Sequence, residues 1–90
     1  MRIYKYPILI TVGDKAQTYM HKDAQVISAQ VQDGRLMFWA MVDSENAKLE
    51  LQKELRYFHL IPTGMEFEGV GKFISTVQHA GIVLHIFEDA

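Results

Sequence analysis

The sequence contains no cysteine, only two prolines and no excess of basic residues. Without cysteine there are no disulfide bonds, thiolate metal sites or cysteine nucleophiles, which suits a reducing compartment such as the cytoplasm. Nine basic residues against eleven acidic ones leave a formal net charge of -2. The chain therefore lacks the positive excess that neutralises a nucleic-acid backbone. We expect a cytoplasmic protein that does not bind DNA or RNA.

Long apolar runs are also missing. The opening stretch "MRIYKYPILITVGD" has only a short apolar run with no small-residue cleavage site after it, so we expect neither a signal peptide nor a membrane span. The composition, with 49% hydrophobic and 22% charged residues, is that of a globular protein. Ninety residues are enough for one hydrophobic core, which predicts a single domain over residues 1–90.

A turn signal stands between two apolar runs in the stretch "VISAQVQDGRLMFWAMVD", Val26 to Asp43. The run before the turn has a period of two, which is typical of a strand. Asp33 and Gly34 suit a two-residue type I′ turn, because both central positions of that turn need positive φ. The stretch therefore predicts a β-hairpin.

Four more segments have strand character. "RIYKYPILI" contains Pro7, which has no backbone donor and so indicates an edge strand or a bulge. "AQTYMH" can pair with it across "VGDK". Near the end, "GKFISTVQ" and "GIVLHIFE" are β-branched and aromatic runs separated by "HAG", which predicts a second hairpin.

The segment "AKLELQKELRYFHLIP" fits two templates. Leu51, Leu55 and Phe58 have helical spacing, whereas apolar residues also fill most alternate places. We favour a long strand, because its neighbours are strands and it ends in the turn signal "IPTG"; a helix around 45–58 is the alternative. The sequence thus predicts a mainly β fold, a single small antiparallel sheet or sandwich-like domain of six or seven strands.

Motifs for catalysis or metal binding are absent. No two of the four histidines stand two apart in a strand or four apart in a helix, and a zinc site would need a third ligand as well. None of the serines lies in G-x-S-x-G, and "GVGKF" lacks the spacing of a phosphate-binding loop. We expect a protein that is not an enzyme and holds no metal or cofactor.

Aromatic and cationic side chains are the remaining candidates for a binding site. Phe38 and Trp39 must point to opposite faces of their strand. Because "LMFWAMV" is apolar on both faces, the second face needs a cover from a helix, loops or another subunit. Trp39 is therefore either a core residue or part of an interface or ligand site. The candidate binding residues are Trp39, Tyr57, Arg35, Arg56, His59 and His85.

The motifs "YKYPI", "VISAQVQDGRLMFWAMVD" and "GKFISTVQHAGIVLHIFE" together resemble a small uncharacterised family found in phages and bacteria. That family has a Lys-Tyr-Pro-Leu start, a strand ending Ser-Val-Gln, an Asn-Gly or Asp-Gly turn, a Trp-Ala-Leu-Val-Asp strand and a close in His-Val-Phe-Glu. In the middle, this chain has "YFHLIPTGMEF" where that family has a Gly-Thr-Gly-His-like segment. The matching positions are Lys5, Tyr6, Pro7, Ser28, Gln30, Gly34, Trp39, Ala40, Val42, Asp43, His85, Phe87 and Glu88.

This resemblance implies a compact β-rich fold in a phage or prophage setting. Small phage accessory proteins commonly act by binding, so the leading hypothesis is an inhibitor or modulator of a host defence protein. The alternatives are a homo-oligomer that sequesters a small signalling molecule such as a nucleotide, and a structural or assembly component. The expected partners are a host protein or a second copy of the chain. A flat exposed patch would favour the first hypothesis and a pocket between subunits the second.

Overall fold

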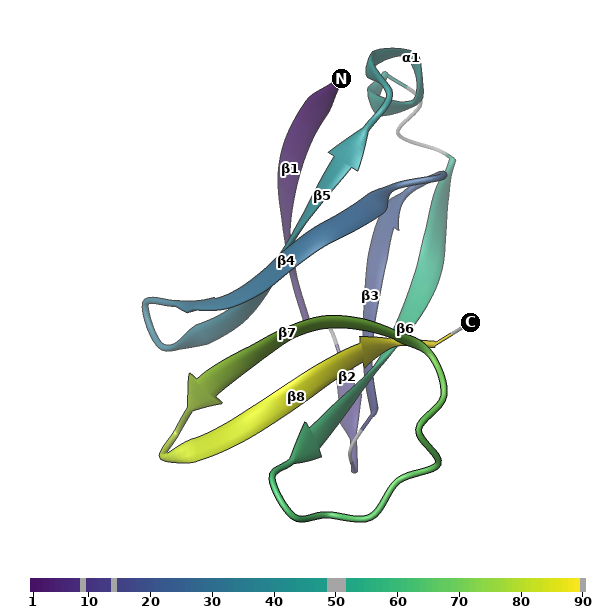
Figure 1. The fold of residues 1–90 in the computed structure, drawn as a ribbon. Coiled ribbons are helices and arrows are strands. Elements are labelled where there is room, and N and C mark those ends of the chain that lie inside the picture. The colour runs from purple at the N-terminus through teal and green to yellow at the C-terminus, as the bar shows by residue number, and fades with distance from the viewer. Residues whose placement is uncertain (9, 14, 49–51, 90) are drawn as a thin grey trace.

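The computed structural model describes residues 1–8, 10–13, 15–48 and 52–89, which form two antiparallel sheets and one short helix (Figure 1). The prediction of a mainly β, antiparallel fold is confirmed, and of the two arrangements predicted, the sandwich-like one is adopted. The elements within these ranges are β1 (Arg2–Pro7), β2 (Ile10–Val12), β3 (Lys15–His21), β4 (Gln25–Gln32), β5 (Arg35–Val42), α1 (Ser44–Ala47), β6 (Lys53–Pro62), β7 (Lys72–His79) and β8 (Ile82–Glu88).

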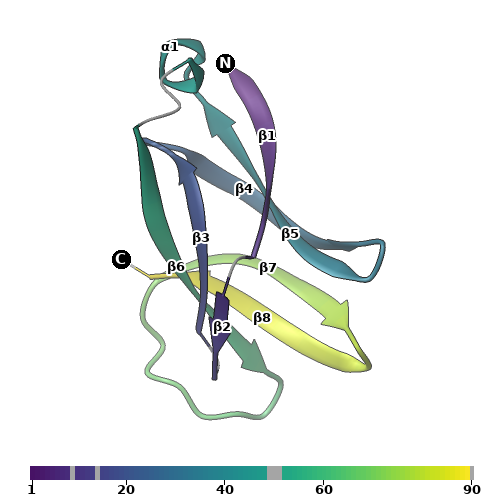
Figure 2. The same cartoon turned by 180° about the vertical axis from the view of Figure 1, so that it is seen from behind.

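The strands divide between a three-stranded sheet, in the order β1-β5-β4, and a five-stranded sheet, in the order β2-β3-β6-β8-β7. Figures 1 and 2 show the tips of the β4–β5 and β7–β8 hairpins on the same side of the molecule. The described ranges hold eight strands rather than six or seven, because the first predicted strand is divided into β1 and β2.

Both predicted hairpins are present. Asp33 and Gly34 between β4 and β5 have φ of 52° and 77°, as a type I′ turn requires. Ala80 and Gly81 between β7 and β8 repeat this pattern with φ of 52° and 79°. Local turn chemistry therefore sets the register of both hairpins.

The chain passes from one sheet to the other just after Pro7. Pro7 is the last residue of β1, which lies at the edge of the three-stranded sheet, as the missing backbone donor predicts. β2 begins at Ile10 in the other sheet. The Thr18 hydroxyl, itself buried, donates a hydrogen bond of 2.6 Å to the Pro7 carbonyl and so ties β3 to this crossing.

The core lies between the two sheets. Alternate residues of β5 face inward and are buried, among them Phe38. The Phe38 ring stacks on that of Phe58 from β6, with centroids 4.1 Å apart. Each ring is fully buried, which stabilises the fold by about 3 kcal/mol per side chain. This contact joins the centres of the two sheets.

The edges β4 and β7 meet along a seam. The Ser75 hydroxyl donates to the Ala29 carbonyl oxygen at 3.0 Å and accepts from the Ala29 N–H at 2.9 Å. Strand pairing shifts register beside both residues, between Val26 and Ser28 and between Phe73 and Ser75. One side chain thus replaces the backbone pairing that the β4 edge lacks at Ala29.

The favoured strand is confirmed from Lys53 onward, so the alternative helix around 45–58 is not formed there, and a short helix, α1, lies before it at Ser44–Ala47. α1 is a single turn, capped where the Asp43 carboxylate accepts from the Glu45 N–H at 2.8 Å. From Lys53 to Pro62 the chain is strand, because β6 pairs with β3 on one side and β8 on the other. Residues 49–51 lie outside the described ranges. No helix in the described part of the chain is long and apolar enough to cross a membrane.

Candidate functional site

The outer face of the five-stranded sheet carries a group of aromatic side chains, here called the aromatic face. It includes every exposed aromatic side chain of the described residues. Phe73 is 54% exposed, Tyr19 52%, Tyr57 41% and Phe67 39%. Phe87 lies among them and is half-buried.

Strand alternation explains the outward direction of Tyr57 and Tyr19. The residue that follows each of them, Phe58 or Met20, is fully buried in the core, so the tyrosines face the other way. Tyr19 pairs with Leu55, two places before Tyr57. The two phenol rings therefore stand on diagonally neighbouring positions of β3 and β6.

The segment 63–71 runs from the end of β6 round to the start of β7 (Figure 1) and is called the crossing loop. Its Phe67 lies 5.0 Å from the Phe87 ring, and Phe73 at the start of β7 packs edge-on against Phe87 at 5.4 Å. Aromatic pairs at these separations contribute about 1 kcal/mol each beyond their burial. Phe87 therefore anchors the crossing loop to β8.

A hollow of about 360 Å³ opens between the crossing loop and the sheet; we call it the charged hollow. On the sheet side, Lys15 and His59 are cross-strand partners. Both approach the Asp89 carboxylate, Lys15 Nζ at 3.7 Å and His59 Nε2 at 3.5 Å. The Asp89 N–H donates to the Tyr57 carbonyl oxygen at 2.8 Å, which fixes the residue just after β8.

On the loop side the charged hollow is lined by Glu66, Phe67, Glu68 and Val70. Neither glutamate side chain forms a hydrogen bond or ion pair with another described residue, and both residues are exposed. Their carboxylates are thus available to accept from a ligand. Within the described ranges, no three histidine, aspartate or glutamate side chains converge as metal ligands.

His85 lies on the same outer face, under the start of the crossing loop. Its Nε2 is 2.8 Å from the Thr63 hydroxyl and its Nδ1 is 3.0 Å from the Thr76 hydroxyl. Both ring nitrogens are therefore occupied. The imidazole joins the crossing loop to the β7–β8 hairpin, next to the buried Ile61 with which it pairs across strands.

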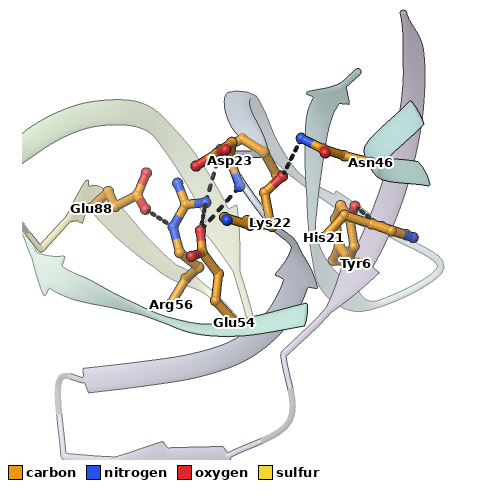
Figure 3. Close-up of polar contacts among 9 residues, drawn as sticks. Tyr6, His21, Lys22, Asp23, Asn46, Glu54, Arg56 and Glu88 are labelled. Carbon is orange, nitrogen blue, oxygen red and sulfur yellow. Dashed lines mark hydrogen bonds and ion pairs between the residues drawn. The ribbon is translucent and has the colours of Figure 1, made fainter. Parts of the chain in front are cut away.

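Arg56 points to the opposite side of β6 from Tyr57. Its Nε donates to Glu88 Oε2 at 2.5 Å, and its Nη1 donates to the Ala24 carbonyl at 2.8 Å and to Glu54 at 3.3 Å (Figure 3). The guanidinium is largely buried and holds the end of β8 to the β3–β4 turn. Its contacts are thus internal to the fold.

Trp39 and Arg35 belong to the other sheet. Trp39 is half-buried on the outer face of the three-stranded sheet, between its cross-strand partners Lys5 and Ser28, and so lies outside the buried core. Arg35 begins β5 at the tip of its hairpin and is exposed.

The predicted binding residues therefore fall in three places. Tyr57, His59 and His85 share the outer face of the five-stranded sheet, Arg56 lies behind it, and Trp39 and Arg35 lie on the other sheet. Sequence reasoning missed the rest of the aromatic face. The alternation of "RYFH" predicted that Tyr57 and His59 share a side, but only the β3–β6 register places Lys15 beside His59. The residues missed are Lys15, Tyr19, Glu66, Phe67, Glu68, Phe73 and Asp89.

Comparisons with known proteins identify the family of this chain and nothing further. No curated protein and no solved structure matches this chain. One family model, described as "Domain of unknown function (DUF7352)", matches residues 1–90. That match confirms the expectation of an uncharacterised family. Over its full length, the chain belongs to the DUF7352 family, a domain of unknown function.

Proposed function

We propose that this protein acts by binding another protein through the aromatic face, and that the partner is a protein of a bacterial host cytoplasm whose activity it modulates. The observation that carries the proposal is the gathering of all exposed aromatic rings of the described residues on one side of one sheet. The phage setting implied by the sequence resemblance supplies the kind of partner.

Aromatic rings left in contact with water favour a binding role. Water contact at such rings is unfavourable, and contiguous apolar patches on small proteins commonly mark interaction sites. Tyrosine and phenylalanine are enriched in the cores of protein interfaces, and a few such residues supply most of the binding energy. Phe73, Tyr57 and Tyr19 are the most suited to this role, because each projects from a paired strand.

The charges around the aromatic face indicate the chemistry of the partner. Glu66 and Glu68 flank Phe67 on the crossing loop and lack partners among the described residues. Lys15, by contrast, is already paired with Asp89. A lysine or arginine beside an apolar residue would fit this loop, since its cation can meet a carboxylate and a ring face together.

The charged hollow adjoins the aromatic face, because Phe67 belongs to both. His59 and Lys15 both direct their nitrogen atoms at Asp89. These contacts hold the rim of the hollow in place.

The proposal is tested by two matched substitutions. Phe73→Glu places a charge on the aromatic face, and Ile3→Glu places one at a similarly exposed apolar position, 61% exposed, on the three-stranded sheet. Each purified protein is incubated with a bacterial host lysate, and the recovered partners are quantified by mass spectrometry. We expect wild type and Ile3→Glu to retain a stoichiometric partner that Phe73→Glu loses.

Circular dichroism and urea denaturation of each variant provide the control for folding. If Ile3→Glu loses the partner and Phe73→Glu keeps it, the interface lies on the three-stranded sheet and the proposal is wrong. Salt dependence gives a second measurement, because a contact between Glu66 or Glu68 and a basic partner weakens as ionic strength rises.

A further inference from the structure

A second hollow lies where the tips of the two hairpins approach each other, the left side of the molecule in Figure 1. Its volume is about 400 Å³, and we call it the hairpin-tip hollow. Its polar side chains are Arg35, His79 and Thr11, and its apolar ones are Pro7, Ile8 and Leu36. The hollow is on a different part of the molecule from the aromatic face and shares no lining residue with the charged hollow.

The polar side chains come from separate strands. Arg35 begins β5 of the three-stranded sheet, while His79 ends β7 and Thr11 is the middle residue of β2 in the five-stranded sheet. No carboxylate is among the described residues that line the hollow. The seam between the sheets therefore gathers two basic side chains and a hydroxyl with no acidic group among them.

Arg35 and His79 are also unengaged. Neither side chain forms a hydrogen bond or ion pair with another described residue. The cross-strand partner of Arg35 is Gln32, whose side-chain oxygen accepts from Lys5 Nζ at 2.8 Å instead. Arg56, in contrast, is neutralised by two carboxylates. The fold thus leaves the guanidinium of Arg35 beside the hollow with all its donors available.

We propose that the hairpin-tip hollow is a binding site for a small anion, a phosphate or carboxylate group carried on a compact apolar body. A guanidinium presents a planar set of donors that matches either oxyanion in a bidentate contact. His79 and Thr11 supply further donors from the opposite sheet. Pro7, Ile8 and Leu36 offer the apolar surface on which the body of the ligand rests.

Three aromatic compounds of similar size test the site: phenyl phosphate, benzoate and the uncharged benzamide. Each is titrated into ¹⁵N-labelled protein, and amide shifts are followed by NMR. We expect saturable shifts at Gly34, Arg35 and His79 with one or both anions and none with benzamide. Saturation by phenyl phosphate alone identifies a phosphate site, and saturation by benzoate alone a carboxylate site.

Variants show whether Arg35 carries the binding. Arg35→Gln should lower the affinity for the anion by about tenfold or more, since a charge-assisted hydrogen bond is lost. His79→Gln should lower this affinity by a smaller factor. Arg2→Gln, at an exposed arginine of β1, is the matched control and should leave the affinity unchanged. An unchanged fold is checked from the rest of each NMR spectrum.

Any of three results would overturn the proposal. The amide shifts do not saturate with either anion up to about 10 mM, Arg35→Gln binds the anion with the same affinity as wild type, or the shifts centre on Lys15 and His59 instead. Phe73→Glu should bind the anion as wild type does. A loss of anion binding at this site can therefore be distinguished from a loss of protein binding at the aromatic face.

Discussion

Replacing Gly71 with alanine should destabilise the protein far more than the same change at Gly69, two residues earlier on the crossing loop. Both glycines have positive φ, 98° and 74°, so both variants place a side chain in an unfavourable backbone conformation. The two sites differ in what surrounds them. A Cβ at Gly71 would lie 2.5 Å from the Glu88 carbonyl oxygen, whereas a Cβ at Gly69 meets nothing within 4 Å.

The expected costs follow from these distances. Positive φ alone destabilises each variant by about 1–2 kcal/mol. At Gly71 the backbone of Glu88 must also move, and overpacking of this kind costs about 1–3 kcal/mol more. Glu88 is not free to shift, because its carboxylate holds Arg56 and its backbone pairs with Lys72 on β7.

Urea denaturation followed by far-ultraviolet circular dichroism measures the difference. For a protein of this size, with a slope of about 1 kcal/mol per molar urea, the midpoint of Gly71→Ala should lie about 1–3 M below that of Gly69→Ala. A Gly71→Ala variant that does not fold, beside a Gly69→Ala variant that does, would also agree with the expected order of stability.

Equal midpoints would refute the reasoning. They would mean that the end of β8 yields to a methyl group at no cost, and hence that the Arg56–Glu88 contact does not hold this strand in place. The crossing loop would then be free to change its path over the aromatic face.

Three further outcomes are expected. Arg56→Met should lower the free energy of unfolding by about 3 kcal/mol in urea denaturation, because it leaves the partly buried Glu88 carboxylate without its cation, and a loss below about 1 kcal/mol would contradict this role. Ser75→Ala should cost about 1–2 kcal/mol and speed hydrogen exchange of the Ala29 amide, whereas unchanged exchange would show that the seam does not depend on this hydroxyl. The outer faces of both sheets expose apolar side chains, so we also expect a homo-oligomer, and light scattering that returned one 10.4 kDa chain at micromolar concentration would contradict it.

Local chemistry was enough to predict the two hairpins. Asp33-Gly34 and Ala80-Gly81 adopt positive φ where the sequence placed its turns. The period of two predicted for the strand before Asp33 is interrupted by the register shift between Val26 and Ser28, which leaves both Val26 and Ala29 buried. The turns depend on residues close in sequence, so they can be read without the rest of the fold. The edge position of Pro7 follows in the same way from its missing donor.

The segment around 45–58 shows where local patterns fail. Its side chains suited a helix and a strand about equally, and the choice from Lys53 onward depends on hydrogen bonds to β3 and β8. β3 is more than thirty residues away in sequence and β8 at least twenty. Tertiary pairing therefore overrides the helical propensity of "KELR".

The sequence by itself determined the β class, the hairpins with their turns and the opposite directions of Phe38 and Trp39, because each depends on neighbours within a few residues. Only the tertiary structure decided which strands share a sheet, and with that how the candidate residues are grouped. It placed Lys15 beside His59 and brought Arg35 and His79 to one hollow. These groupings depend on strand pairing and sheet packing between distant segments, which no local pattern in the chain encodes.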